Sequence, residues 1–112
     1  MEIKEVRAHH IPAQNGVDPI DVFIVWYGEQ AFQVTIRCWD SAWTGYRGSC
    51  GYDRIEDYFV DVWYERGYQE HLVNVFAATS RHTTQREEKW LFKILQNVSK
   101  HFKDMRPHHE ST

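Results

Sequence analysis

The segment from Arg37 to Gly51 gathers the residue types that dominate binding surfaces in proteins. It contains two Trp, one Tyr, two Arg and three Gly. Trp, Tyr and Arg combine a large contact area with a polar group, and truncating them in interfaces often costs much of the binding energy. We therefore predict a surface that recognises a partner protein. The expected partner-binding residues are Arg37, Trp39, Trp43, Tyr46 and Arg47, with Asp57 and Asp61 as an acidic rim.

The rings of Trp39 and Trp43 also have a purely structural interpretation. If helices cover the side of the sheet that carries them, both rings are core residues, because large aromatic side chains are mostly buried. The chain has three further Trp residues and is 15% aromatic, so a core rich in rings is expected in either case.

No catalytic signature accompanies this segment. Cys38 alternates with the core-facing Ile36 and is typical of a small buried apolar residue. Cys50 lies in a glycine-rich turn, where we expect it to be more open, but no nucleophile elbow surrounds it. We therefore predict that the protein is not an enzyme.

The histidines and acidic residues do not have metal-ligand spacing. No His pair matches the zinc-protease pattern and no CxxC motif is present. Asp57 and Asp61 are close enough on one helix face to hold a divalent cation, but a solvated acidic face is the favoured interpretation. We expect neither a metal nor any other cofactor.

A single-stranded nucleic-acid-binding domain is the main alternative to a protein-binding one. Aromatic and arginine side chains on a sheet resemble, in composition, the platforms on which bases stack. The net charge of −3 opposes phosphate binding, and Asp40 lies in the middle of the patch. A protein partner is therefore favoured over nucleic acid.

The length of 112 residues predicts one α+β domain over residues 1–107 and a flexible tail over residues 108–112. Apolar patterns predict strands at 1–11, 20–27, 31–39 and 42–47, then helices over 55–66, 68–78 and 85–106. Strands followed by helices indicate an antiparallel β-meander of three to four strands with three helices packed on one face. The continuous apolar run at 22–27 predicts a central strand covered on both faces.

Local signals refine the helical half. Capping boxes are expected at Asp53–Glu56 and Thr84–Glu87, and Gly67 suits the left-handed residue after a helix. We expect Asp57, Asp61 and Glu65 on the outer side of the first helix. The last helix is predicted to bury a stripe that ends at Met105 and to stop at Pro107.

The chain has no secretory signal and no apolar run near the length of a membrane span. We therefore expect a cytoplasmic protein with two free thiols and no contact with membranes. Exposed strand edges and surface rings are consistent with a monomer or a homodimer.

The region from Phe32 to Leu72 resembles a recurrent type of small protein encoded in phages and prophages. The resemblance rests on short motifs: Val34-Thr35-Ile36 ahead of Trp39, Ala42-Trp43-Thr44-Gly45-Tyr46, Gly48-Ser49-Cys50-Gly51, Ile55-Glu56-Asp57-Tyr58-Phe59 and Gly67-Tyr68. It covers about a third of the chain, and no catalytic residue carries over from that group.

The resemblance implies a phage accessory protein. Such proteins are rich in small inhibitors of host machinery, including anti-CRISPR proteins, so we expect a non-enzymatic inhibitor that acts by occluding a host protein. If phage-encoded, it would act in the host cytoplasm. A bacterial toxin-immunity protein is a further alternative, connected to this chain only by its size and acidic composition.

Overall fold

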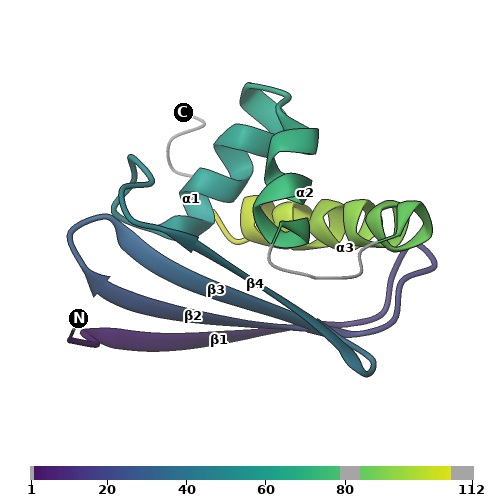
Figure 1. The fold of residues 1–112 in the computed structure, drawn as a ribbon, viewed down its shortest axis with the longest axis horizontal. Helices are drawn as coiled ribbons and strands as arrows, with labels where there is room; N and C mark the ends of the chain where they lie inside the picture. The colour runs from purple at the N-terminus through teal and green to yellow at the C-terminus, as the bar shows by residue number, and fades with distance from the viewer. Residues whose placement is uncertain (1, 79–83, 107–112) are drawn as a thin grey trace.

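The computed structural model of the protein describes residues 2–78 and 84–106, which form a sheet layer and a helical layer (Figure 1). The strands are β1 (Glu5–Ile11), β2 (Ile20–Gly28), β3 (Ala31–Cys38) and β4 (Ser41–Arg47), all antiparallel and in the spatial order β1-β2-β3-β4. The helices are α1 (Ile55–Val60), its π-helical continuation η1 (Asp61–Glu65), α2 (Gln69–Ala77) and α3 (Gln85–Asp104). The predicted α+β meander followed by three helices is confirmed.

The helical layer covers one face of the sheet, which we call the inner face. In β3 the buried side chains are Phe32, Val34, Ile36 and Cys38, as the alternation in the sequence predicts. They face the apolar stripe of α3, which buries Leu91, Ile94, Leu95, Val98 and Phe102. The two apolar surfaces form the core.

The prediction that β2 is covered on both faces is wrong. Val22 and Ile24 are buried, but Phe23 between them is 41% exposed. All helices lie on the same side of the sheet (Figure 1), so the residues of β2 that point away from them meet no second layer. A continuous apolar run hides this difference, because Phe23 is as hydrophobic as its buried neighbours.

The helix α2 approaches the sheet closely at Gly45 in β4. A Cβ atom at this position would lie 2.9 Å from Cγ1 of Val75 and 3.1 Å from the ring of Phe76. Such distances are too short for an added side chain, so glycine is required by the close approach of the two layers.

The predicted capping box at Asp53–Glu56 does not form. The residue before α1 is Arg54, which gives no side-chain cap, and the carboxylate of Glu56 turns toward β1 instead. Glu56 accepts two hydrogen bonds from Arg7, at 3.0 Å from Nε and 2.7 Å from Nη2, and lies 3.2 Å from Nε2 of His9. This bidentate ion pair ties the edge strand β1 to α1.

Two other helix-end signals, at Thr84 and Gly67, are confirmed. Thr84 caps α3 by accepting a hydrogen bond from the backbone amide of Glu87 at 3.2 Å. Gly67 has a φ of +70° and follows the end of η1. The predicted stop at Pro107 and the tail at 108–112 lie outside the described residues.

Two side chains of the helices do not lie where the pattern places them. Asp61 is buried rather than on the outer side, because the side chains of Arg66 and Tyr52 lie against its carboxylate. Its carbonyl accepts from the amide of Arg66, five residues on, at 2.8 Å. Met105 is 51% exposed rather than in the core, since it follows the last residue of α3.

Because Glu56 and Arg7 form an ion pair, we expect the free energy of unfolding to decrease in acid. Burial of the Glu56 carboxyl opposes its ionisation, but the hydrogen bonds from Arg7 and a backbone amide outweigh burial and lower its pKa below 4.5. A lowered carboxyl pKa stabilises the fold above the unfolded-state value and is lost as pH falls through the folded-state value. We expect Glu56→Gln to lower the free energy of unfolding at pH 7 by about 2 kcal/mol, because it leaves the partly buried guanidinium of Arg7 without its charged acceptor.

The measurement is urea denaturation of both proteins from pH 7 to pH 3. The wild type should lose stability below about pH 4.5, and the variant should lose less over the same range. Equal pH slopes for the two proteins would contradict the role of Glu56. The neighbouring His101 adds a separate loss that begins near pH 6.5, because burial and His9 lower its pKa.

Trp43 provides a test of the core. Its side chain is 4% exposed and packs edge-on against Trp90, with ring centroids 5.2 Å apart. Removal of a buried aromatic ring leaves a cavity, so Trp43→Ala should lower the free energy of unfolding by about 3 kcal/mol. The matched variant Trp39→Ala removes the same ring from a 66% exposed site and should change stability by less than about 0.5 kcal/mol. Urea denaturation measures both values, and similar losses would contradict the assignment of Trp43 to the core.

Candidate functional site: the outer face of the sheet

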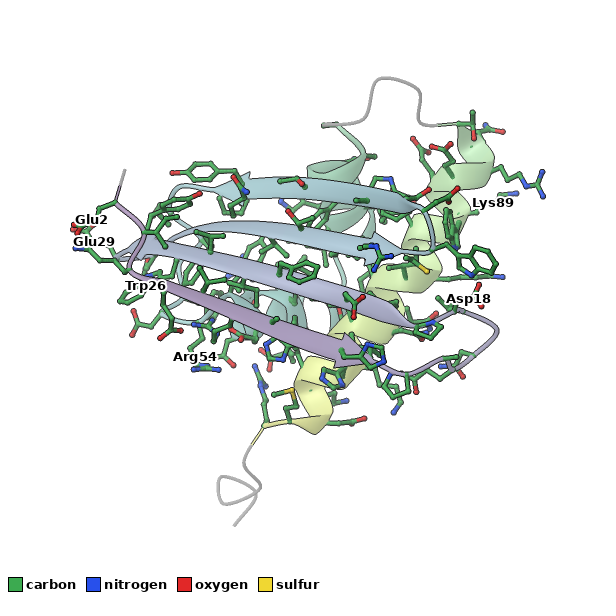
Figure 2. All side chains as sticks on the ribbon, turned by 90° about the horizontal axis from the view of Figure 1, so that it is seen from below. Glu2, Asp18, Trp26, Glu29, Arg54 and Lys89 are labelled. Atoms are coloured by element: carbon green, nitrogen blue, oxygen red, sulfur yellow. The ribbon has the colours of Figure 1, made fainter. Side chains whose placement is uncertain are left out.

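The face of the sheet that points away from the helices is open, and Figure 2 views the molecule from this side. The register of the strands aligns its side chains in three rows that run across all four strands. We call this surface the outer face, and it consists of Val6, Val25, Gln33 and Tyr46; Ala8, Phe23, Thr35 and Thr44; and His10, Asp21, Arg37 and Ala42.

The first two rows contain apolar and uncharged polar side chains and no charged residue. Val6 is 61% exposed and Tyr46 46% exposed, and the ring of Tyr46 lies 6.2 Å from that of Tyr27. Thr35 and Thr44 share a hydrogen bond of 2.9 Å between their hydroxyl groups, which fixes the middle of the face. Exposed apolar side chains that gather on one surface, as these do, often mark an interaction site.

The third row carries the charges of the outer face. Nδ1 of His10 lies 2.8 Å from one carboxylate oxygen of Asp21, and Nη1 of Arg37 lies 3.2 Å from the other. Asp21 and Arg37 are the one acidic and the one basic residue among the twelve. The outer face therefore has no formal net charge when His10 is neutral.

Trp39 stands at the end of this face, in the turn that joins β3 to β4. The sequence predicts it as the last residue of the strand, but β3 ends at Cys38, which pairs with Ser41. Trp39 has a φ of +60°, a conformation that residues with large side chains rarely adopt. Holding it there costs about 1 kcal/mol or more, and strain of this kind often marks functional positions.

The structure brings together three of the seven residues predicted to bind a partner. Arg37 and Tyr46 lie on the outer face, and Trp39 lies at its end. All three are exposed to solvent. They remain candidates for the site.

Trp43 and Arg47 do not belong to this surface. Both alternate with Tyr46 along β4 and therefore point to the inner face, where Trp43 is a core residue. The guanidinium carbon of Arg47 lies 5.6 Å from the ring centroid of Tyr58 in α1. The prediction that these residues share a surface with Trp39 is wrong, because strand alternation separates neighbours in sequence onto opposite faces.

The predicted acidic rim is also not part of the outer face. Asp57 lies in α1, within the helical layer, 3.6 Å from Nε of Arg106. Asp61 is buried and its carboxylate lies 2.8 Å from Nε of Arg66. Each carboxylate is thus occupied by an arginine of the same layer.

The sequence reasoning missed Phe23 and Asp21. A signal was present, since Asp21 is the one charged residue of β2 and its side chain must point away from the core. Residues two and four positions later, Phe23 and Val25, share that direction. The charged residue therefore marked the open side of the strand.

The helical layer contains a separate groove between α2 and α3 with a volume of about 740 Å³. Val73 and Phe92 line it together with Glu70, Lys89 and Lys93. Among residues 2–78 and 84–106, no three His, Cys, Asp or Glu side chains converge in a way that would hold a metal ion. None of the helices described has the length and apolar character of a membrane span.

Comparison with known proteins gives one result. Neither curated proteins nor solved structures match the chain. The family Phage_phiTE_072, described as a phage family, matches residues 1–71, which comprise the whole sheet, α1, η1 and the start of α2. The match contains nearly all of the segment that resembles phage proteins and extends it through the first two strands. The chain therefore belongs to this family of phage proteins.

Proposed function

We propose that this phage protein binds a host protein through its outer face and Trp39, and that it inhibits the host protein by occlusion. Anti-CRISPR action, or inhibition of another bacterial defence, is the form of this function that we favour. The observation that carries the proposal is an uncovered sheet face without net charge that ends in an exposed Trp. No chemical step is assigned to the protein.

The balance of charge favours a protein partner over nucleic acid. Phosphate groups are bound by unpaired Lys and Arg side chains, and they supply most of the affinity for single strands. Arg37 is the one Lys or Arg among the twelve residues of the outer face, and it is paired with Asp21 at 3.2 Å. Apolar rows with one internally paired charged row suit the core of a protein interface, where charged residues are depleted.

Trp39 is the proposed anchor of this interface. Its ring is 66% exposed although its backbone conformation is unfavourable for any residue other than glycine, Asn or Asp. Neither core packing nor backbone preference accounts for a Trp at this position. A binding role accounts for both the exposure and the strain, since truncation of a Trp that anchors an interface typically costs about 2 kcal/mol or more.

The substitution Trp39→Gly separates binding from stability. Glycine adopts positive φ without strain, so this variant should be as stable as the wild type or up to about 1 kcal/mol more stable. Capture of the partner from a lysate of the bacterial host should fall at least tenfold, because the anchor is lost. The readouts are urea denaturation and affinity capture with quantitative mass spectrometry.

Tyr68→Ala is the matched control, because Tyr68 is 59% exposed but lies in the helical layer. This variant should capture the partner as well as the wild type does. Loss of capture with Tyr68→Ala and not with Trp39→Gly would place the site on the helices instead. In a host with an active defence system, expression of the wild type should raise phage plating efficiency and expression of Trp39→Gly should not.

A nucleic-acid-binding function is the alternative, favoured by one observation. The four-stranded antiparallel sheet carries Phe23, Tyr46 and other side chains on an open face, as in domains that stack RNA bases. Fluorescence anisotropy with a labelled 20-nucleotide single strand, titrated with salt, tests it. We expect no micromolar binding at about 50 mM salt, whereas micromolar binding that weakens steeply with salt would replace our proposal.

A further inference from the structure

We propose that the outer face also binds a second copy of this chain, face to face, so that the protein forms a homodimer. The part of this proposal that concerns regulation rests on the proposed function, because the dimer hides the surface assigned to the host protein. The dimer itself is argued from the pattern of side chains on the outer face alone.

The three rows of the outer face are complementary to themselves. A two-fold axis parallel to the strands and midway between β2 and β3 lays β2 of one copy over β3 of the other. Each row then lies over the same row of the second copy. Asp21 faces Arg37 of the second copy, and Arg37 faces its Asp21, so two pairs of opposite charge form across the interface.

Three of the five other kinds of pair combine a larger with a smaller side chain. Phe23 faces Thr35 of the second copy. His10 faces Ala42, and Val6 faces Tyr46, since β1 of one copy lies over β4 of the other. No pair of like charges arises among the twelve residues of the outer face. A second copy of the chain already presents the charges and side-chain sizes that match the outer face, whereas any other binding partner would have to supply them.

The geometry is that of two aligned sheets. Sheets that pack face to face lie about 10 Å apart with their strands within about 30° of each other. Asp21 and Arg37 lie on the two strands next to the axis, so this angle displaces them less than it displaces His10 and Ala42 in the same row. The charge pairs are therefore the contacts of the third row that the twist of the sheets changes least.

The size of the face predicts a weak dimer. Four strands spaced about 4.8 Å apart and some seven residues long outline roughly 400 Å² on each copy. Stable interfaces bury about 800 Å² of accessible surface per partner, so this one lies at the small end. We expect association at high protein concentration and dissociation on dilution, which leaves the face available to a host protein that binds more tightly.

Charge reversal tests the dimer, with sedimentation velocity of the full chain measured over a concentration series. Asp21→Arg places two arginines opposite each other in a homodimer, and Arg37→Asp places two aspartates opposite each other. Each variant alone should therefore associate at least tenfold more weakly than the wild type. An equimolar mixture of the two should recover association, because every charge then faces its opposite, and so should the double variant.

Asp104→Arg on α3 is the control for a change of net charge, because Asp104 pairs with Lys100 away from the sheet. It should associate as the wild type does. Thermal melting followed by circular dichroism checks that each single variant is folded, and recovery in the mixture shows that both retain the face.

A wild type that stays monomeric at every concentration overturns the dimer. Single variants that associate as the wild type does also overturn it, as does a mixture of folded variants that does not recover. None of these results bears on the proposed function, which is read from capture by Trp39→Gly and Tyr68→Ala. Conversely, a wild type that captures no partner from the lysate would contradict the proposed function and would not change the conclusion about the dimer from sedimentation.

Discussion

Coverage of only one face of the sheet by helices is the constraint on which the structure depends. Side chains alternate along each strand, so a single helical layer divides every strand into core positions and surface positions. Ile36 and Arg37 are neighbours in sequence and lie in these two different environments. The core and the candidate site are therefore two sides of the same four strands. A change that shifts the register of one strand would move the residues of both.

The β1 edge of this sheet is secured by charge as well as by apolar packing. In the inner direction β1 contributes Arg7 and His9 beside the buried Ile11, whereas the buried inner side chains of β2 and β3 are all apolar. The shared partner of Arg7 and His9 is Glu56, which is buried at the start of α1. A bidentate ion pair has a defined direction, so it fixes the position of β1 against α1 more specifically than an apolar contact does. The side chains of β1 that point the other way, Val6, Ala8 and His10, remain part of the outer face.

Periodicity predicted the fold because the alternation in β3 and the helical stripe in α3 are both strong. The strand and helix types, their order and the packing of helices on one face follow from those patterns. The site was predicted only in part, since an enriched segment such as Arg37–Gly51 does not say which of its residues share a face. Trp43 belongs to the core because of the alternation in β4. Asp61 is buried because Arg66 and Tyr52 lie against its carboxylate, a contact that helical periodicity alone does not predict. Glu56 looked like a helix cap because its true partner, Arg7, lies 49 positions away in the sequence.

The family match ends at residue 71, whereas the core does not. The matched part supplies all four strands but not α3, whose Leu91, Ile94 and Leu95 are fully buried in the core. The part of the chain that matches the family is thus shorter than the part that is needed to complete the core. A fragment cut where the similarity stops would present the apolar side of the sheet to water, so relatives that share only this part need some other cover for it. The same four-stranded sheet is therefore compatible with more than one kind of layer packed on its inner face.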